Sequence, residues 1–241
     1  KKNNKTGGGN VSRLPKVSCA CPTIPSRLRF IRQTMHLYMM QDYAGESELV
    51  IFEDGGNSME AQVEGWASEL DLPANKTIVY KTTSEKLALG KKRQELVTLH
   101  CSGELIVFWD DDDYYYPTRV SYTVRKLLSN PNARGGGCSE QEMFFATLGR
   151  IYFIDKNPSP FHATAGTMGL WKKYFFPGNG EDPPLCFDGN RDYAEEKSLL
   201  KEYTVPIVQF DIKKIMMIIC HGGHNSVPKE QLVNRSNMQM S

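Results

Sequence analysis

From about residue 16 onwards, two patterns of hydrophobic and polar residues take turns along this chain. Short apolar runs rich in valine, isoleucine and phenylalanine have the length and β-branched content of buried strands. Between these runs, apolar residues recur every three or four positions, as on the buried face of an amphipathic helix. Up to residue 109 the pattern predicts strands over 16–23, 48–54, 77–80 and 105–109, separated by helices over 28–41, 59–70 and 89–100.

Strands that alternate with helices predict an α/β fold with a parallel sheet and helices on both of its faces. We expect a single domain over residues 16–230. A flexible linker or cloning remnant over 1–15 is expected to precede it, and a polar tail over 231–241 to follow it.

The pattern is less regular in the second half of the chain. Three consecutive glycines, Gly135–Gly137, predict a flexible loop over 130–138 that serves as a lid. A further loop is expected over 176–190. The remaining predicted elements are helices over 119–128 and 191–203 and strands over 142–154, 162–171, 206–210 and 216–220.

Composition narrows the function classes only slightly. The 241 residues are 40% hydrophobic and 24% charged, which is ordinary for one domain with a real core. A net charge of +1 gives no support to nucleic-acid or membrane-surface binding, and no apolar run reaches transmembrane length. The six cysteines show no CxxC pair and no zinc spacing, so we expect reduced thiols and a cytoplasmic location.

An acidic stretch directly follows the apolar run 105–109. Asp110, Asp111, Asp112 and Asp113 are adjacent, at the strand end where open α/β sheets place their ligands. Their mutual repulsion favours a bound cation, and hard oxygen ligands suit Mg²⁺, Mn²⁺ or Ca²⁺. One alternative is a solvated acidic turn that caps the helix after Pro117; an EF-hand loop is disfavoured because its ligand spacing is absent.

Several landmarks occur in order along the chain. They are Pro22–Arg27, Gln41–Tyr43, Phe52–Gly56, Gly90–Arg93, Phe108–Asp113 with Pro117, Gly166–Met168, Glu195–Glu196 and His221–Asn225. Together they resemble the nucleotide-sugar-dependent glycosyltransferases of the GT-A fold, in their large family 2-like group, which implies a mixed, mainly parallel, Rossmann-like sheet flanked by helices. A weaker similarity, over 194–206, is to glycosyltransferases encoded by large DNA viruses.

The resemblance implies a donor site built from the first half of the chain. Thr23, Pro25 and Arg27 would line the nucleotide pocket. Asp54 would accept a hydrogen bond from the base, most often uracil. From the local sequence alone, a turn cap ahead of two glycines explains Asp54 equally well.

A basic run on the third predicted helix would face the donor diphosphate. The cationic ends of Lys91, Lys92 and Arg93, with the helix N-terminus, would neutralise its charge. Asp110 and Asp111 would complete this side of the donor site. The alternative for the basic run is a solvated helix face.

The resemblance also implies a divalent-metal site. Asp110 and Asp112 match the DxD element, so Asp112, with Asp110 or Asp113, would bind the ion that bridges the diphosphate oxygens. His221 and His224 lie in a glycine-rich turn that would supply a further ligand, and an imidazole suits Mn²⁺ better than Mg²⁺. The alternative is a pair of turn histidines on the surface.

The family's general base would lie in the pair Glu195–Glu196, which is followed by Leu199 at the expected spacing. The match puts Glu196 in the base position, with glutamate in place of the usual aspartate. Asp192, one turn away on the same predicted helix, is a second candidate. Glu181–Asp182 spells the same motif but lies among prolines, and the whole acidic run could instead be a solvated helix face.

The resulting hypothesis is an inverting, Mn²⁺- or Mg²⁺-dependent transfer of a sugar from a nucleotide sugar, with a UDP-sugar favoured, to an acceptor hydroxyl. The acceptor would be a glycan or glycoprotein, recognised around residues 135–138, Trp171 and 176–190. A nucleotidyltransferase, an inactive nucleotide- or carbohydrate-binding module and a metal-dependent hydrolase stay as alternatives.

Overall fold

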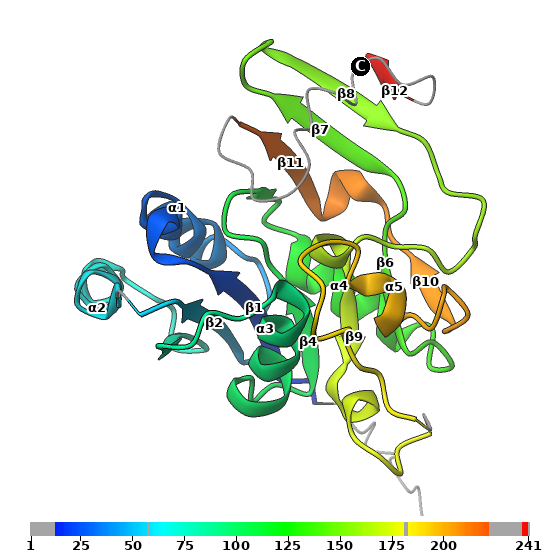
Figure 1. Cartoon of the computed structure of the whole chain (residues 1–241), viewed down its shortest axis with the longest axis horizontal. Coiled ribbons are helices and arrows are strands. Elements are labelled where there is room, and N and C mark those ends of the chain that lie inside the picture. The colour runs from blue at the N-terminus through cyan, green and yellow to red at the C-terminus, as the bar shows by residue number, and fades with distance from the viewer. Residues whose placement is uncertain (1–12, 57, 181–182, 222–237, 241) are drawn as a thin grey trace, which may run out of the picture.

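The fold is known from a computed structural model that describes residues 13–56, 58–180, 183–221 and 238–240. Its centre is a sheet of seven strands in the order β10-β6-β9-β4-β1-β2-β3 (Figure 1). The bounds of these strands are β1 Val17–Thr23, β2 Ser47–Asp54, β3 Lys76–Thr83, β4 Leu105–Phe108, β6 Gly135–Gly137, β9 Gly169–Trp171 and β10 Ile207–Gln209.

The sheet is mixed but mainly parallel, as the resemblance implies. Strands β3, β2, β1 and β4 run parallel to one another, because a crossover segment separates each from the next along the chain. Strand β9 runs antiparallel to both β4 and β6, and β6 and β10 are parallel. The predicted fold class is confirmed.

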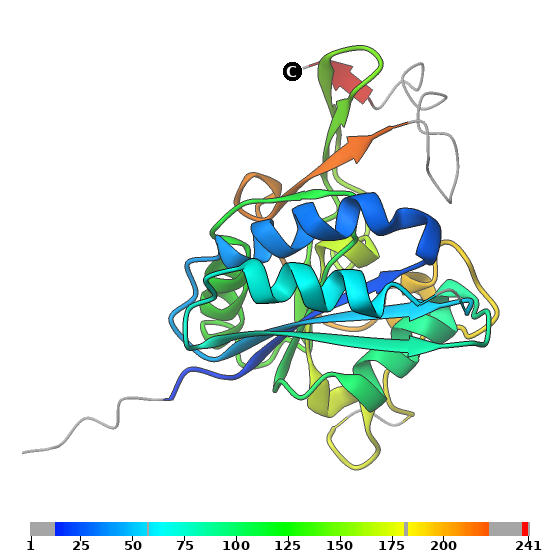
Figure 2. The ribbon, with the colours of Figure 1, turned by 90° about the vertical axis from the view of Figure 1, so that its left-hand side faces the viewer.

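Helices cover both faces of this sheet. Helices α1 (Leu28–Met39) and α2 (Glu60–Glu69) lie side by side over one face (Figure 2). Helix α4 (Arg119–Leu128) contributes to the same hydrophobic core. Helix α3 (Leu89–Glu95) continues into the helical turn Leu96–His100, and this turn and α5 (Glu196–Leu199) pack in a second core. Two cores arise because successive strand side chains point to opposite faces of the sheet.

No helix in the described ranges is long and apolar enough to cross a membrane.

A second, smaller sheet stands above the main one (Figures 1 and 2). It has the order β12-β8-β7-β11-β5. Its last strand, residues 238–240, lies within the predicted polar tail and pairs antiparallel with β8; the rest of 231–241 lies outside the described residues. Its strands are β5 Tyr114–Tyr115, β7 Gln141–Phe145, β8 Arg150–Ile154, β11 Met216–Cys220 and β12 Met238–Met240.

The predicted loop over 130–138 forms at residues 130–134, but the prediction that the three glycines are a flexible lid is wrong. Gly135–Gly137 is strand β6, buried between β9 and β10. A Cβ at Gly136 would come within 3.0 Å of the Phe210 ring, and one at Gly135 would come as close to Leu170. The three glycines therefore permit close packing of backbones rather than flexibility.

Two other predicted elements are shorter than the sequence pattern indicates. Of the strand expected over 162–171 only Gly169–Trp171 forms, and Ala165–Thr167 is a 3-10 turn. Of the helix expected over 191–203 only α5 forms. Ala194 before it and residues 201–203 after it have positive φ, which a right-handed helix excludes.

Candidate functional site

The acidic stretch leaves the main sheet directly after β4 and is held by aromatic packing. The Trp109 and Tyr115 rings stack with centroids 3.9 Å apart, and the backbone N–H of Asp110 donates to the Tyr115 hydroxyl at 2.6 Å. This anchor divides the four carboxylates into two groups. Asp110 and Asp113 line a cavity on one side, and Asp111 and Asp112 pair with Arg27 on the other.

The cavity has a volume of about 230 Å³ and brings together residues that are far apart in the chain. Its walls come from the end of β4, from α3, from the turn before β9, from β11 and from the segment leading into α5. Of the residues that the sequence predicts for the site, those lining it are Arg93, Asp110, Asp113, Asp192, Glu195 and Glu196.

Arg93 connects the two acidic walls of this cavity. Its Nε donates to Glu195 Oε1 at 2.8 Å, and its Nη2 donates to Asp110 Oδ1 at 2.7 Å. Burial disfavours the charged guanidinium, but the Asp110 and Glu195 carboxylates outweigh that effect and raise the pKa of Arg93 above its usual value. Arg93 thus stays charged, and it fixes the entry to α5 against the end of β4.

Glu195 and Glu196 have different surroundings although they are adjacent. The Glu195 carboxylate is buried against Arg93. Glu196, the first residue of α5, is half-buried at the cavity wall. Burial, together with the negative charge of Glu195, raises the pKa of Glu196 to about 7. A carboxylate with this pKa is suited to take a proton near neutral pH.

Asp192 is not part of the helix on which the sequence places it. It precedes α5, is exposed, and accepts a hydrogen bond from the Leu89 backbone N–H at 3.0 Å. That N–H is the first of α3, so the carboxylate lies at the positive end of the helix. Asp192 also lines the cavity, and its role as an alternative base stays a prediction.

The other two acidic residues surround Arg27, the last residue of the 3-10 turn Pro25–Arg27. Arg27 Nε lies 2.9 Å from Asp111 Oδ1, and Nη2 pairs with Asp112. Thr23 donates from Oγ1 to Asp111 Oδ2 at 2.6 Å. Burial raises the pKa of Asp111 to about 7, although the Arg27 charge opposes the shift. This cluster explains how the fold tolerates adjacent carboxylates.

His221 approaches the same cluster from the end of β11. Its Nε2 lies 3.0 Å from Asp112 Oδ2, and its ring is tilted on Phe30 with centroids 4.7 Å apart. His224 lies outside the described residues. Asp112 and His221 thus bring a carboxylate oxygen and an imidazole nitrogen together.

These residues fit a divalent cation in two respects. Carboxylate and imidazole are suitable ligands for Mn²⁺, and the Arg27 guanidinium already acts as a cation beside Asp111 and Asp112. Within the described ranges, however, no group of three or more acidic, histidine or cysteine side chains is arranged to hold a metal. A complete coordination shell would need donors beyond those present here, such as the oxygens of a bound diphosphate.

Asp54 and Lys92 form a buried pair instead of a surface that faces a ligand. Asp54 is fully buried, ion-paired with Lys92, and accepts from the Leu87 backbone N–H at 2.6 Å. Lys92 also donates to the Thr23 carbonyl at 2.9 Å. In this arrangement the pair supports the loop after β1, and direct contacts of Asp54 with a base and of Lys92 with a diphosphate stay predictions.

Lys91 points away from the buried basic residues beside it. Its ammonium is exposed and pairs with Glu85 at 2.9 Å. Pro25 opens the 3-10 turn that carries Arg27, where its fixed φ suits the first helical position. These placements leave a direct donor contact by Lys91 or Pro25 as a prediction.

Sequence reasoning missed Arg119, the first residue of α4. Its fully buried guanidinium donates to the carbonyls of Thr167 at 2.7 Å, Gly166 and Met168 at 3.1 Å, and Phe108 at 3.3 Å. Arg119 thereby ties the turn before β9 to the end of β4. The sequence signal for Arg119 is an arginine on the mainly apolar, buried face of an amphipathic helix.

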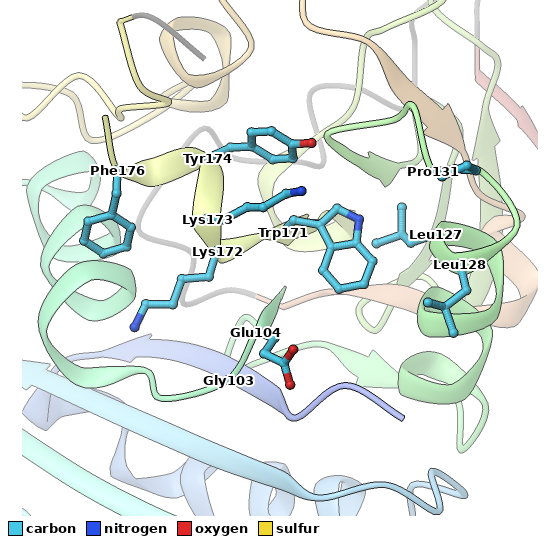
Figure 3. Close-up of a pocket in the computed structure, with 10 residues that line it drawn as sticks. All are labelled: Gly103, Glu104, Leu127, Leu128, Pro131, Trp171, Lys172, Lys173, Tyr174 and Phe176. Atoms are coloured by element: carbon cyan, nitrogen blue, oxygen red, sulfur yellow. The ribbon is translucent and has the colours of Figure 1, made fainter. Parts of the chain in front are cut away.

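A larger hollow, whose lining Figure 3 shows, includes none of the residues Asp110–Asp113 in its lining. It measures about 660 Å³ and is lined by Trp171, Phe176 and Glu104 among others. Trp171 pairs with Leu105 at the beginning of β4, whereas Asp110 follows the end of that strand. Trp171 and Phe176, which the sequence suggests for acceptor recognition, therefore lie at the opposite end of β4 from the acidic cavity.

Comparisons with known proteins identify the fold. No family model matches the sequence, and no curated protein matches it significantly. S. aureus TarS (residues 1–349) in complex with UDP-GlcNAc is 17% identical, with 87% of this chain and 60% of that chain covered and a TM-score of 0.63. The mannosyltransferase PcManGT from Pyrobaculum calidifontis, in complex with GDP-Man and Mn²⁺, is 13% identical, with 88% and 59% covered and a TM-score of 0.62.

These likenesses show that the chain has the GT-A fold that the sequence landmarks predict. The chain spans about 60% of the length of these two structures. Neither comparison supports the weaker resemblance to viral enzymes.

Proposed function

We propose that this protein is a metal-dependent, inverting glycosyltransferase that moves a sugar from a nucleotide-sugar donor to an acceptor hydroxyl. The observation that carries the proposal is the cavity in which Asp110 and Asp113 face Glu195 and Glu196, with Arg93 between them. The GT-A fold supports it, because the compared structures were solved with UDP-GlcNAc and GDP-Man.

Asp112 and His221 are the residues that would hold a divalent cation, with Mn²⁺ favoured by the imidazole. A bound cation stabilises the negative charge that grows on a leaving diphosphate. The loop after β1, with Thr23 and Arg27, lies beside these residues and would contribute to the donor site. A UDP-sugar is the favoured donor.

Glu196 would act as the general base. In an inverting transfer the acceptor oxygen attacks the anomeric carbon from the face opposite the leaving group. The new bond joins the acceptor oxygen to that carbon, the bond from carbon to the diphosphate oxygen breaks, and the hydroxyl proton passes to the Glu196 carboxylate. Arg93 and Glu195 position this carboxylate, since both hold the start of α5 beside Asp110.

A thermal-shift panel tests the donor site. UDP, UDP-sugars, GDP and GDP-mannose would each be added with Mn²⁺ and with a chelator. A ligand that binds only the folded protein at 100 times its Kd stabilises it by about 2.7 kcal/mol. We expect one nucleotide class to raise the melting temperature and the chelator to abolish that rise. If no nucleotide shifts the melting temperature, the proposal is wrong.

A further inference from the structure

We infer that Arg27 sets the affinity of this protein for a divalent cation, because its guanidinium and the cation compete for the Asp111 and Asp112 carboxylates. The inference rests on the proposed function, which puts a cation at Asp112. It adds a residue that controls how tightly that cation binds.

The first observation is that one side chain neutralises two adjacent carboxylates. Arg27 Nε lies 2.9 Å from Asp111 Oδ1, and Nη2 pairs with Asp112 Oδ2. The Arg27 side chain is only 12% exposed and that of Asp112 only 13%, so water screens the pair weakly. The guanidinium occupies the position of a counter-ion for these two residues.

The second observation is that Arg27 uses the same oxygen as the proposed second metal ligand. His221 Nε2 lies 3.0 Å from Asp112 Oδ2, and Arg27 Nη2 pairs with that oxygen as well. A cation shared by Asp112 and His221 would be next to the guanidinium. Two positive charges at this separation in a poorly hydrated site repel strongly. Arg27 and a bound cation would therefore compete for Asp112.

The third observation is that the position of Arg27 is fixed by its surroundings. The residue ends the 3-10 turn that Pro25 begins, and its backbone N–H donates to the Ile24 carbonyl at 2.9 Å. Its guanidinium also lies 5.4 Å from the centre of the Phe30 ring, on which His221 packs. The competing charge is thus built into the site rather than supplied by a freely moving side chain.

The consequence is a cost that every cation meets on binding. The cation must break or weaken the pairing of Arg27 with Asp112, so the apparent affinity is lower than the carboxylates alone would give. Removing the charge of Arg27 should tighten cation binding, although it removes a contact from the site. If Arg27 only helped to build the site, its substitution would instead weaken cation binding.

Direct Mn²⁺ binding to the full chain, with and without UDP or GDP, tests the inference, and unbound Mn²⁺ is measured by electron paramagnetic resonance. The variants are Arg27→Gln and Arg27→Lys, and the matched control is Arg29→Gln. Arg29 is exposed and lies over the same Phe30 ring at 4.6 Å, but forms no ion pair within the described part of the chain. Circular dichroism verifies that each variant is folded.

We expect the Kd for Mn²⁺ to fall about tenfold in Arg27→Gln. In Arg27→Lys, which keeps one charge but loses the planar fork, we expect about threefold. The control should stay within about twofold of the wild type, because its charge is solvated. Should Arg27→Gln prove unfolded without metal, Arg27→Lys carries the test alone, and an unchanged or higher Kd in that variant overturns the inference.

The outcomes separate the inference from the proposed function. Equal or weaker Mn²⁺ binding in Arg27→Gln, with clear binding by the wild type, overturns competition by Arg27 and leaves the metal site standing. A lack of Mn²⁺ binding in the wild type and in every variant, with and without the nucleoside diphosphate, overturns both the metal site and the inference.

Discussion

Glu195 and Glu196 show how strongly surroundings separate two identical side chains. The carboxylate of Glu195 is neutralised by Arg93, whereas Glu196 has burial and a negative neighbour, and its pKa rises to about 7. Glu195 is therefore suited to stabilise the structure through its ion pair, and Glu196 is suited to exchange a proton. The sequence alone does not distinguish them, because the distinction depends on an arginine more than one hundred positions away.

The raised pKa of Glu196 has a consequence for stability. Its folded-state pKa of about 7 lies above the usual glutamate value of 4.5, so the folded state favours the protonated carboxyl. The stabilisation is fully present below about pH 4.5 and is lost as the pH rises through about 7. We therefore expect Glu196→Gln to raise the melting temperature relative to the wild type more at pH 8 than at pH 5. Equal differences at both pH values would show that the pKa is not raised.

Arg93 offers a second test at the level of a single residue. Arg93→Met would leave the Asp110 and Glu195 carboxylates without their shared counter-ion. Removing one partner of a buried ion pair costs about 3–5 kcal/mol, so we expect a loss of that size in urea unfolding. Arg93→Lys keeps the charge but cannot bridge both carboxylates. Its unfolding free energy should therefore lie between those of the wild type and Arg93→Met. A loss below about 1 kcal/mol for Arg93→Met would contradict the bridging role.

Strands and helices in which apolar residues recur at a regular spacing could be predicted from the sequence. The helix over 119–128 and the first four strands form where the pattern places them, with end shifts of a few residues. The elements around residues 135, 165 and 195 were mispredicted. Their conformations depend on neighbouring backbones and on positive φ values, which no local periodicity encodes.

Strand β6 gives a test at the scale of elements. Gly136→Ala would place a methyl group against the Phe210 ring, where real Cβ atoms do not fit, so we expect a loss of about 1–3 kcal/mol in unfolding free energy. Gly65→Ala is the matched control. Gly65 lies within α2, and an added Cβ there would meet no atom within 4 Å. The control should gain about 0.5–1 kcal/mol, because alanine favours the helix. If the two variants have the same stability, β6 is not packed as described.

For the molecule as a whole, the order of elements explains why the site forms where it does. The acidic stretch follows a central strand, and α3 and α5 both begin beside it, although they are distant in sequence. The sequence could predict that acidic residues gather at this end of the sheet. It could not predict which of the four face the cavity, because a turn has no fixed side-chain period. That choice is made by the stacking of Trp109 on Tyr115 and by Arg27.

Turnover of the donor, followed by proton nuclear magnetic resonance of the anomeric signals, tests glycosyl transfer by this site most directly. The wild type and Glu196→Gln would be incubated with Mn²⁺ and the nucleotide sugar that stabilises the protein best. We expect the wild type to release nucleoside diphosphate and to form a sugar product of inverted configuration. Glu196→Gln should be about 10²–10⁴-fold slower, because it lacks the base. Equal rates in the two proteins, or a product of retained configuration, would contradict the proposed mechanism.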